Sequence, residues 1–489
     1  MLRRPHPLDA VGRVSFLGTF RGLRTLASEL MIKGGQVVTM DSELGDFSPG
    51  DVLIRDGTIA EVGPRAVPTS DAQVVDATGM IVLPGFIDSH RHLWQTILRG
   101  TITDWTIKRY VQAIRIHVAR HFTSADTYVS THAGALDALQ AGVTTLVDYA
   151  HNVNAEADAT EALRAFDETG IRAVWSMGML AAPGATGQFC TDLDTRIGVF
   201  DELARERRNG SHRVTVGIAP GELGFTDIAR VTTEWNAARR HDALVTLHTN
   251  ATPAESGEIQ ALGEAGLLDE RTILVHCNFV SEREWELLSE SGATISLQAE
   301  SEIGLASGLP VIADMRDRGL EPTIGVDTVA YNSGDMFSQM RSALQFVRQI
   351  DDVRLWEDDP LPDAHKTLCR EALAWATING ARAAGLADST GSLTPGKRAD
   401  LIMLDTAHPS FLGLWGDDPV GATVLHGSTA AVDTVLVDGQ VVKRDGRLVG
   451  VDLERVHELV REAQRRLGLA LGDGPRNGLI PDPLPDLDA

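Results

Sequence analysis

The sequence predicts an α/β protein: a (β/α)8 TIM-type barrel together with a small β-sandwich formed by both chain ends. Through the middle of the chain, short apolar runs typical of buried strands alternate with amphipathic helical stretches. Eight such runs occur over a length close to the roughly 250 residues typical of this barrel. The regions on either side instead carry short strand patterns separated by turns. These two kinds of region predict one barrel and one smaller β module.

The smaller module is expected from residues 31–82 and 396–450 together. Three β-forming segments precede the barrel, at residues 32–40, 51–54 and 58–62. Three more follow it, at residues 399–404, 432–437 and 440–442. Asp438-Gly439 separates the last two segments and is typical of a hairpin turn. Two β-rich ends around a long α/β middle favour a single sandwich to which both ends contribute.

The barrel is expected over residues 83–395. Its eight strand candidates are residues 81–87, 144–149, 173–177, 214–219, 244–248, 272–276, 293–297 and 323–326. A helical pattern follows each strand, for example over residues 124–141 and 281–291. Strand and helix therefore alternate in the way that builds a parallel barrel.

The two extreme ends of the chain are interpreted as additions to this fold. Residues 1–30 are mildly basic and form a predicted N-terminal extension; Gly18 interrupts their weak apolar patch, so a signal peptide is not favoured. Residues 451–489 are expected to form a helix, over about 452–467, and a Pro- and Asp-rich tail. No apolar run approaches the ~18 residues that a membrane span needs.

Composition and charge narrow the classes of partner. Hydrophobic residues make up 43% of the chain and charged residues 23%, as in soluble globular proteins. The formal net charge of −24 disfavours nucleic acid and anionic membranes, so a neutral or cationic small molecule is the expected partner. The three cysteines do not form a disulfide framework, which favours a reducing, cytoplasmic location. A homo-oligomer is expected, since homodimers are the commonest assembly.

Histidine and aspartate side chains fall where the strands of the predicted barrel end. His90 and His92 follow the first strand, and in an extended segment residues i and i+2 point the same way. His248 ends the fifth strand, and Asp327 follows the eighth. Active sites of such barrels lie at the carboxyl ends of the strands, and imidazole plus carboxylate suits Zn²⁺ or Fe²⁺, and Mn²⁺ less well. A lone histidine is more often a surface or core residue, but this ordered set favours a metal site.

These motifs resemble the amidohydrolase superfamily, in particular the branch that holds cytosine deaminase, guanine deaminase and the triazine chlorohydrolases. The resemblance begins with Pro84-Gly85-Phe86-Ile87-Asp88-Ser89-His90-Arg91-His92 and spans about residues 31–450. It continues through Gly142-Val143-Thr144-Thr145, His276-Cys277, Gly325-Val326-Asp327 and residues 396–400. His90-Arg91-His92-Leu93-Trp94-Gln95 further resembles a subset of this branch.

The resemblance implies specific roles. One divalent metal ion, with zinc expected first and iron or manganese as alternatives, would be held by His90, His92, His248 and Asp327. Asp327 would also accept a proton from the attacking water, and His276 would polarise the substrate or stabilise developing negative charge. The metal would lower the pKa of its bound water from about 15.7 towards ~7.

The chain departs from the branch at one position. Deaminases and chlorohydrolases of this type carry a Glu three residues after the fifth-strand histidine, where it passes a proton to the leaving group. Ala251 occupies that position here. Glu302 is the predicted substitute acid, with Glu255 and Glu222 as weaker candidates because such residues are more often solvated.

Four residues are predicted to bind substrate. Trp94 and Gln95 follow the histidine pair and would grip a planar ring by stacking and hydrogen bonding; packing beneath the metal loop is the alternative for Trp94. His151 and Asn152 follow the second strand and would border the same pocket.

The predicted function is metal-dependent hydrolysis of a C–N bond in an amide, amidine, urea or carbamate-like compound, or hydrolytic deamination or dechlorination of a small cyclic compound. A metal-dependent lyase or decarboxylase is the alternative, motivated by the missing acid at Ala251. A metal-free binding protein on the same scaffold is the third class. It is disfavoured because all four metal ligands and His276 are retained.

Overall fold

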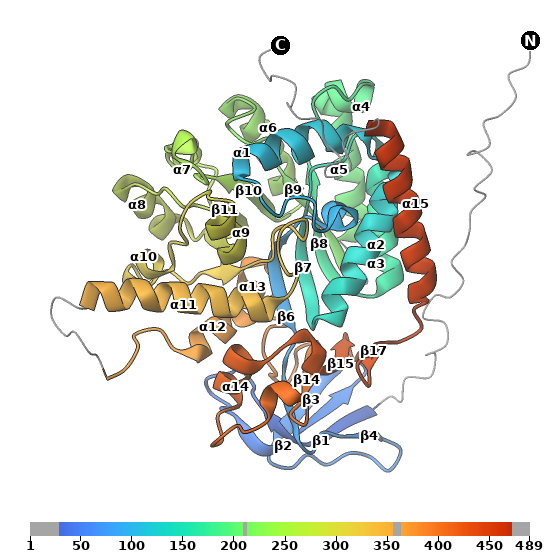
Figure 1. Ribbon diagram of the computed structural model, residues 1–489, viewed down its shortest axis with the longest axis vertical. Helices are drawn as coiled ribbons and strands as arrows, with labels where there is room; N and C mark the ends of the chain where they lie inside the picture. The colour runs from blue at the N-terminus through green and yellow to red at the C-terminus, as the bar shows by residue number, and fades with distance from the viewer. Residues whose placement is uncertain (1–28, 209–212, 356–362, 472–489) are drawn as a thin grey trace, which may run out of the picture.

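The computed structural model describes residues 29–208, 213–355 and 363–471 (Figure 1). The predicted N-terminal extension, apart from its last two residues, and the predicted tail from residue 472 lie outside these ranges. Within them, no helix is long and apolar enough to cross a membrane.

Eight parallel strands, joined in sequence order, form the sheet of the barrel. They are β6 (Phe86–Arg91), β7 (Val143–Ala150), β8 (Arg172–Gly178), β9 (Val214–Ala219), β10 (Val245–Thr249), β11 (Thr272–His276), β12 (Thr294–Leu297) and β13 (Thr323–Ile324). A parallel bridge between Arg91 and Asp327 brings the last strand back to the first. The predicted barrel is therefore confirmed.

The first and last strands approach closely because Gly325 has no side chain. A Cβ atom at Gly325 would lie 2.6 Å from the backbone nitrogen of His90 and 2.7 Å from its carbonyl oxygen. Real Cβ atoms essentially never come this near backbone. A side chain here would separate His90 from the segment that carries Asp327.

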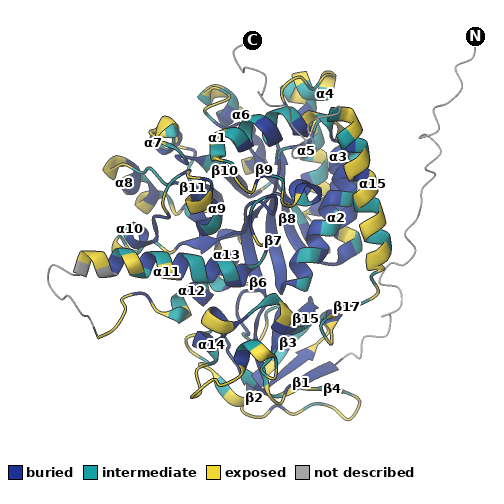
Figure 2. Ribbon diagram, viewed as in Figure 1, coloured by how far each residue is buried: buried dark blue, intermediate teal, exposed yellow. Residues whose placement is uncertain are grey.

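Helices cover the outside of the barrel, with exposed residues on their outer faces and buried residues against the strands (Figure 2). They include α2 (Ser124–Gln140), α3 (Glu156–Thr169), α5 (Leu193–Arg207), α6 (Ile228–Arg240), α7 (Glu258–Glu264), α8 (Glu282–Ser291), α9 (Ala299–Gly304), α10 (Ile312–Asp317), α11 (Met336–Leu355), α12 (Cys369–Trp375) and α13 (Ile378–Ala383). Local sequence sets their starts: Thr123 and Asp126 form a capping box at α2, and Ser281 and Glu284 form one at α8.

A second sheet is built from both sides of the barrel in the sequence, as predicted. Its strands are β1 (Glu29–Val37), β2 (Phe47–Arg55), β3 (Thr58–Gly63), β4 (Gln73–Asp76), β5 (Met80–Pro84), β14 (Leu401–Asp405), β15 (Val432–Val437), β16 (Gln440–Arg444) and β17 (Arg447–Leu448). The two chain segments meet where β5 pairs antiparallel with β14. The buried ion pair between Arg172 and Asp400, 2.7 Å apart, ties this sheet to the barrel.

One strand prediction is wrong. Residues 81–87 were expected as the first barrel strand, but β5 belongs to the terminal sheet and β6 to the barrel. The chain changes sheets at Pro84-Gly85, where a Cβ atom on Gly85 would lie 2.1 Å from the Thr144 hydroxyl oxygen. An unbroken apolar run conceals this change of sheet.

Two further elements stand beside the barrel. The segment after β6 forms α1 (Ile107–Tyr110) and a π-helix over Val111–Val118, a helix type common at functional sites. The C-terminal helix α15 (Leu453–Leu471) lies along α2 (Figure 1). Arg466 of α15 forms an ion pair with Asp126.

Candidate active site

The four predicted metal ligands converge at the carboxyl ends of the barrel strands. The His90 Nε2 atom lies 3.2 Å from the His248 Nε2 atom and 3.5 Å from an Asp327 carboxylate oxygen. The same oxygen lies 3.3 Å from the His92 Nε2 atom. One nitrogen from each of the three histidines lies within 4.8 Å of the others.

Hydrogen bonds on the far side of two rings fix which nitrogen carries the proton. The Nδ1 atom of His92 lies 2.9 Å from the Tyr149 carbonyl oxygen, which can only accept, so Nδ1 must donate. The Nδ1 atom of His248 donates in the same way to Glu222, 2.7 Å away. In the neutral rings both Nε2 atoms therefore carry lone pairs; that of His92 lies 3.3 Å from the Asp327 carboxylate, and that of His248 lies 3.2 Å from His90 Nε2. Lone pairs on several converging Nε2 atoms can bind a divalent cation. The Tyr149 carbonyl and the Glu222 carboxylate, which accept the Nδ1 protons, are the kinds of group that orient metal-ligating histidines.

Glu222 is held by several partners at once. An Arg115 nitrogen donates to both of its carboxylate oxygens at 2.8 Å, and the Tyr149 hydroxyl lies 3.3 Å away. Burial by itself raises the pKa of Glu222, but Arg115 and His248 outweigh it and hold the pKa well below the usual range. Glu222 is thus an ionised acceptor that orients His248.

The backbone is strained where the site is assembled. His276 and Asp327 have φ angles of 74° and 67°, in the left-handed region that residues other than glycine rarely adopt. Asp327 is held there by two hydrogen bonds of 2.8 Å, from its own N–H to the His90 carbonyl and from the His92 N–H to its carbonyl. Such conformations cost about 1–3 kcal/mol each and concentrate at active sites.

Glu302 lies behind His276. Its carboxylate is fully buried, lies 3.3 Å from the His276 Nδ1 atom and accepts from the Gln298 N–H at 2.8 Å. Burial lowers the pKa of His276, but Glu302 and Asp327 outweigh it and raise this pKa above its ordinary value. Glu302 was expected to reach the substrate, yet the described structure does not place it on the cavity wall. It can act only through His276.

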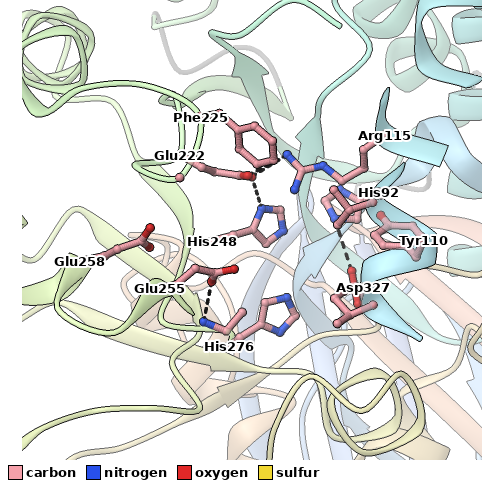
Figure 3. Close-up of a pocket in the computed structure, with 14 residues that line it drawn as sticks. His92, Tyr110, Arg115, Glu222, Phe225, His248, Glu255, Glu258, His276 and Asp327 are labelled. Atoms are coloured by element: carbon pink, nitrogen blue, oxygen red, sulfur yellow. Dashed lines mark hydrogen bonds and ion pairs between the residues drawn. The ribbon is translucent and has the colours of Figure 1, made fainter. Parts of the chain in front are cut away.

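A cavity of about 140 Å³ opens above the histidines (Figure 3). Its wall contains the predicted residues His92, His248, His276 and Asp327 together with Ile107, Tyr110, Val111, Arg115, Glu222, Gly224, Phe225, Ala251, Glu255 and Glu258. Tyr110 and Arg115 were missed by sequence reasoning; they come from the helical segment after β6. A second cavity, of about 200 Å³, shares Arg115 and Phe225 with the first and is also lined by His151.

Of the predicted substrate-binding residues, one lines a cavity and the others are buried behind the cavity wall. His151 borders the second cavity, and its ring nitrogens have no hydrogen-bond partner among the described residues. Trp94 is instead buried, edge-on to Phe122 at a ring distance of 5.2 Å, which is the packing alternative. Gln95 is buried and donates to the Tyr110 hydroxyl at 2.7 Å, so it supports the wall from behind.

Asn152 also lies behind the site. Its side chain is buried and donates to the Thr127 hydroxyl at 2.8 Å, so it is directed at α2. In the structure as described, neither cavity is lined by Trp94, Gln95 or Asn152. A direct grip on substrate by these three residues is therefore not supported.

The chain is similar to known proteins over most of its length. The model of the amidohydrolase family matches residues 81–442. A 5'-deoxyadenosine deaminase of Methanothermobacter thermautotrophicus is 29% identical over 449 residues, covering 90% of this chain and 98% of the relative. A 5-methylthioadenosine/S-adenosylhomocysteine deaminase of Symbiobacterium thermophilum is 30% identical over 456 residues, covering 90% and 99%.

Solved structures share the fold. An adenosine deaminase from Xanthomonas campestris with bound zinc has a TM-score of 0.76 at 23% identity, covering 90% of this chain and 98% of that one. An atrazine chlorohydrolase from Arthrobacter aurescens TC1, complexed with zinc, has a TM-score of 0.77 at 22% identity, covering 90% and 100%. With the family match over most of the chain, the protein belongs to the amidohydrolase family and is a hydrolase.

Proposed function

We propose that the protein binds one zinc ion through His90, His92, His248 and Asp327 and releases ammonia from an amino-substituted heterocycle, such as a purine nucleoside. The observation that carries this proposal is the convergence of the three histidine Nε2 atoms and one Asp327 carboxylate oxygen, with His90 Nε2 lying 3.2 Å from His248 Nε2 and 3.5 Å from Asp327. Zinc, when bound, supplies a Lewis acid and lowers the pKa of water enough for attack near neutral pH.

The surrounding residues fit this chemistry. Asp327 is ionised at neutral pH. Burial alone would raise its pKa, but hydrogen bonds to His90 and His92 outweigh burial and hold the pKa well below the usual range. Asp327 can therefore take the proton of the attacking water. His276 faces the same cavity and can donate to negative charge that develops at the attacked position.

The two adjoining cavities favour a two-part substrate. Phe225 is half-exposed where the cavities meet and offers an aromatic face on which a heteroaromatic ring can stack. A sugar in the second cavity would meet His151, whose Nδ1 atom has no hydrogen-bond partner among the described residues and whose Nε2 atom lies 3.6 Å from a Glu222 oxygen. Relatives named as nucleoside deaminases over nearly the full chain support the same class.

The test combines metal loading with a substrate panel. Protein stripped by a chelator and reloaded with zinc should bind one ion and release ammonia from at least one of adenosine, 5'-deoxyadenosine, 5'-methylthioadenosine, guanine and cytosine. His248→Asn should lose zinc and activity, whereas His426→Asn, at an exposed position of α14 (Pro419–His426), should keep both. Stoichiometric zinc without ammonia release from the panel would contradict the proposal.

The main reason for considering a lyase, the absence of an acid at position 251, no longer applies. Ala251 cannot carry a proton, but the cavity wall contains Glu255 close to that position. A carboxylate able to serve a hydrolytic departure is thus present.

A further inference from the structure

The loop after β10 brings a carboxylate to the place where the family's acid is missing. Ala251, three residues after His248, lies on the cavity wall, and its methyl side chain carries no ionisable group. The chain then turns through a short 3-10 helix, Pro253–Glu255. Glu255 lies at the end of this turn and lines the same cavity.

Glu255 is folded back onto Ala251. One of its carboxylate oxygens accepts the Ala251 backbone N–H at 2.8 Å, and the other accepts the Thr252 hydroxyl at 3.2 Å. Figure 3 shows the carboxylate directed toward the space between His248 and His276. The two hydrogen bonds therefore hold an acid beside the position where other family members carry one.

A second carboxylate, that of Glu258, lines the same cavity. It is held by the Thr249 hydroxyl at 3.0 Å and the Asn250 N–H at 3.4 Å. Burial and then the charge of Glu255 raise the pKa of Glu258 to about 7. Glu258 is therefore partly protonated near neutral pH.

Other carboxylates near the cavity are engaged elsewhere. Glu222 is bound to Arg115 and to His248, and Glu302 is buried behind His276. Glu255 lines the cavity and is partly exposed, and it forms no ion pair with any described residue. Glu258 shares these properties, but Glu255 is the one hydrogen-bonded to Ala251, at the position of the missing acid.

We infer that Glu255 is the catalytic residue that delivers a proton to the departing nitrogen, in place of the acid missing at Ala251. This inference rests on the proposed deamination. Water adds its oxygen to the ring carbon as Asp327 takes one of its protons, and this proton then reaches the amino group through Glu255. The C–N bond breaks with its electron pair on nitrogen, which leaves as ammonia, while the other proton of the water remains on a ring nitrogen.

The experiment compares two leaving groups on one ring. Adenosine and 6-chloropurine riboside share the purine nucleoside frame, but ammonia must be protonated to leave and chloride need not be. Glu255→Gln keeps an oxygen for the Ala251 N–H and cannot deliver a proton. We expect it to lower turnover of adenosine at least about a hundredfold, while turnover of 6-chloropurine riboside changes less than about threefold and zinc content stays the same.

Rescue makes the test specific. Adding Ala251→Glu to Glu255→Gln restores an acid at the family position and should recover most adenosine turnover. Glu264→Gln, on the exposed face of α7, is the matched control and should behave like the wild-type protein. Equal losses for both substrates, or full adenosine turnover in Glu255→Gln, would overturn the inference and leave the proposed function standing. Zinc-loaded wild-type protein that releases ammonia from none of the five panel compounds would instead contradict the proposed function, and this inference with it.

Discussion

Glu222 is predicted to serve metal binding and folding through two different partners, and one substitution separates the roles. Glu222→Gln removes the charge that accepts the His248 Nδ1–H at 2.7 Å and pairs with Arg115 at 2.8 Å. The side chains of Glu222 and Arg115 are only 8% and 17% exposed, so water can replace little of either contact.

The expected magnitudes follow from these contacts. Loss of a carboxylate that orients a metal-bound histidine lowers metal affinity by about 10–100-fold. Leaving Arg115 buried without its anion should lower the free energy of unfolding of the metal-free protein by about 3 kcal/mol. Adding Arg115→Met removes the unpaired charge, so the double variant should regain most of this stability but none of the zinc affinity.

Chelator competition measures the zinc affinity, and urea denaturation of metal-free protein measures the stability. Wild-type zinc affinity in Glu222→Gln would refute the role of Glu222 in orienting His248. A double variant no more stable than Glu222→Gln would show that the loss does not come from the unpaired Arg115.

Three further predictions test neighbouring residues. Asp327→Asn should lower kcat at least about a hundredfold with little change in melting temperature, because it removes the proton acceptor and a metal charge; near-normal kcat in a zinc-loaded sample would contradict this. Glu302→Gln should lower turnover of adenosine and of 6-chloropurine riboside by the same factor, about 10–100-fold. The reason is that Glu302 orients His276 and does not itself give a proton to the leaving group. A loss confined to adenosine would instead identify Glu302 as the acid. Burial raises the pKa of Glu258 to about 7 from an ordinary 4.5, so the folded protein loses stability as the pH rises between these values. Glu258→Gln removes this loss, and its melting temperature in metal-free protein should exceed that of the wild type more at pH 8 than at pH 4; an equal difference at both values would contradict it.

Strand periodicity predicted the barrel well because buried parallel strands are short, apolar and separated by helices. Seven of the eight strand candidates fall on observed strands. The first did not, since residues 81–87 supply strands to two sheets without any break in the apolar pattern. A change of sheet is a property of tertiary packing and leaves no local signal beyond Pro84-Gly85.

The metal-site residues could be predicted from the sequence more reliably than the substrate-binding residues. His90 and His92 could be paired because alternate residues of a strand point the same way. Trp94 and Gln95 lie in a 3-10 helix that follows the strand, so their directions could not be derived from strand spacing. Tyr110 and Arg115 reach the cavity from a helical segment whose path over the barrel no periodicity encodes. Glu255 was undervalued because the hydrogen bond that folds it onto Ala251 exists only in the folded loop.

The most direct test of the central claim is a crystal structure of the zinc-loaded protein, with anomalous diffraction recorded at the zinc absorption edge. One strong peak should lie within about 2.0–2.3 Å of the Nε2 atoms of His90, His92 and His248 and of an Asp327 oxygen. A well-occupied peak elsewhere in the chain, or one from which Asp327 is turned away, would contradict the account.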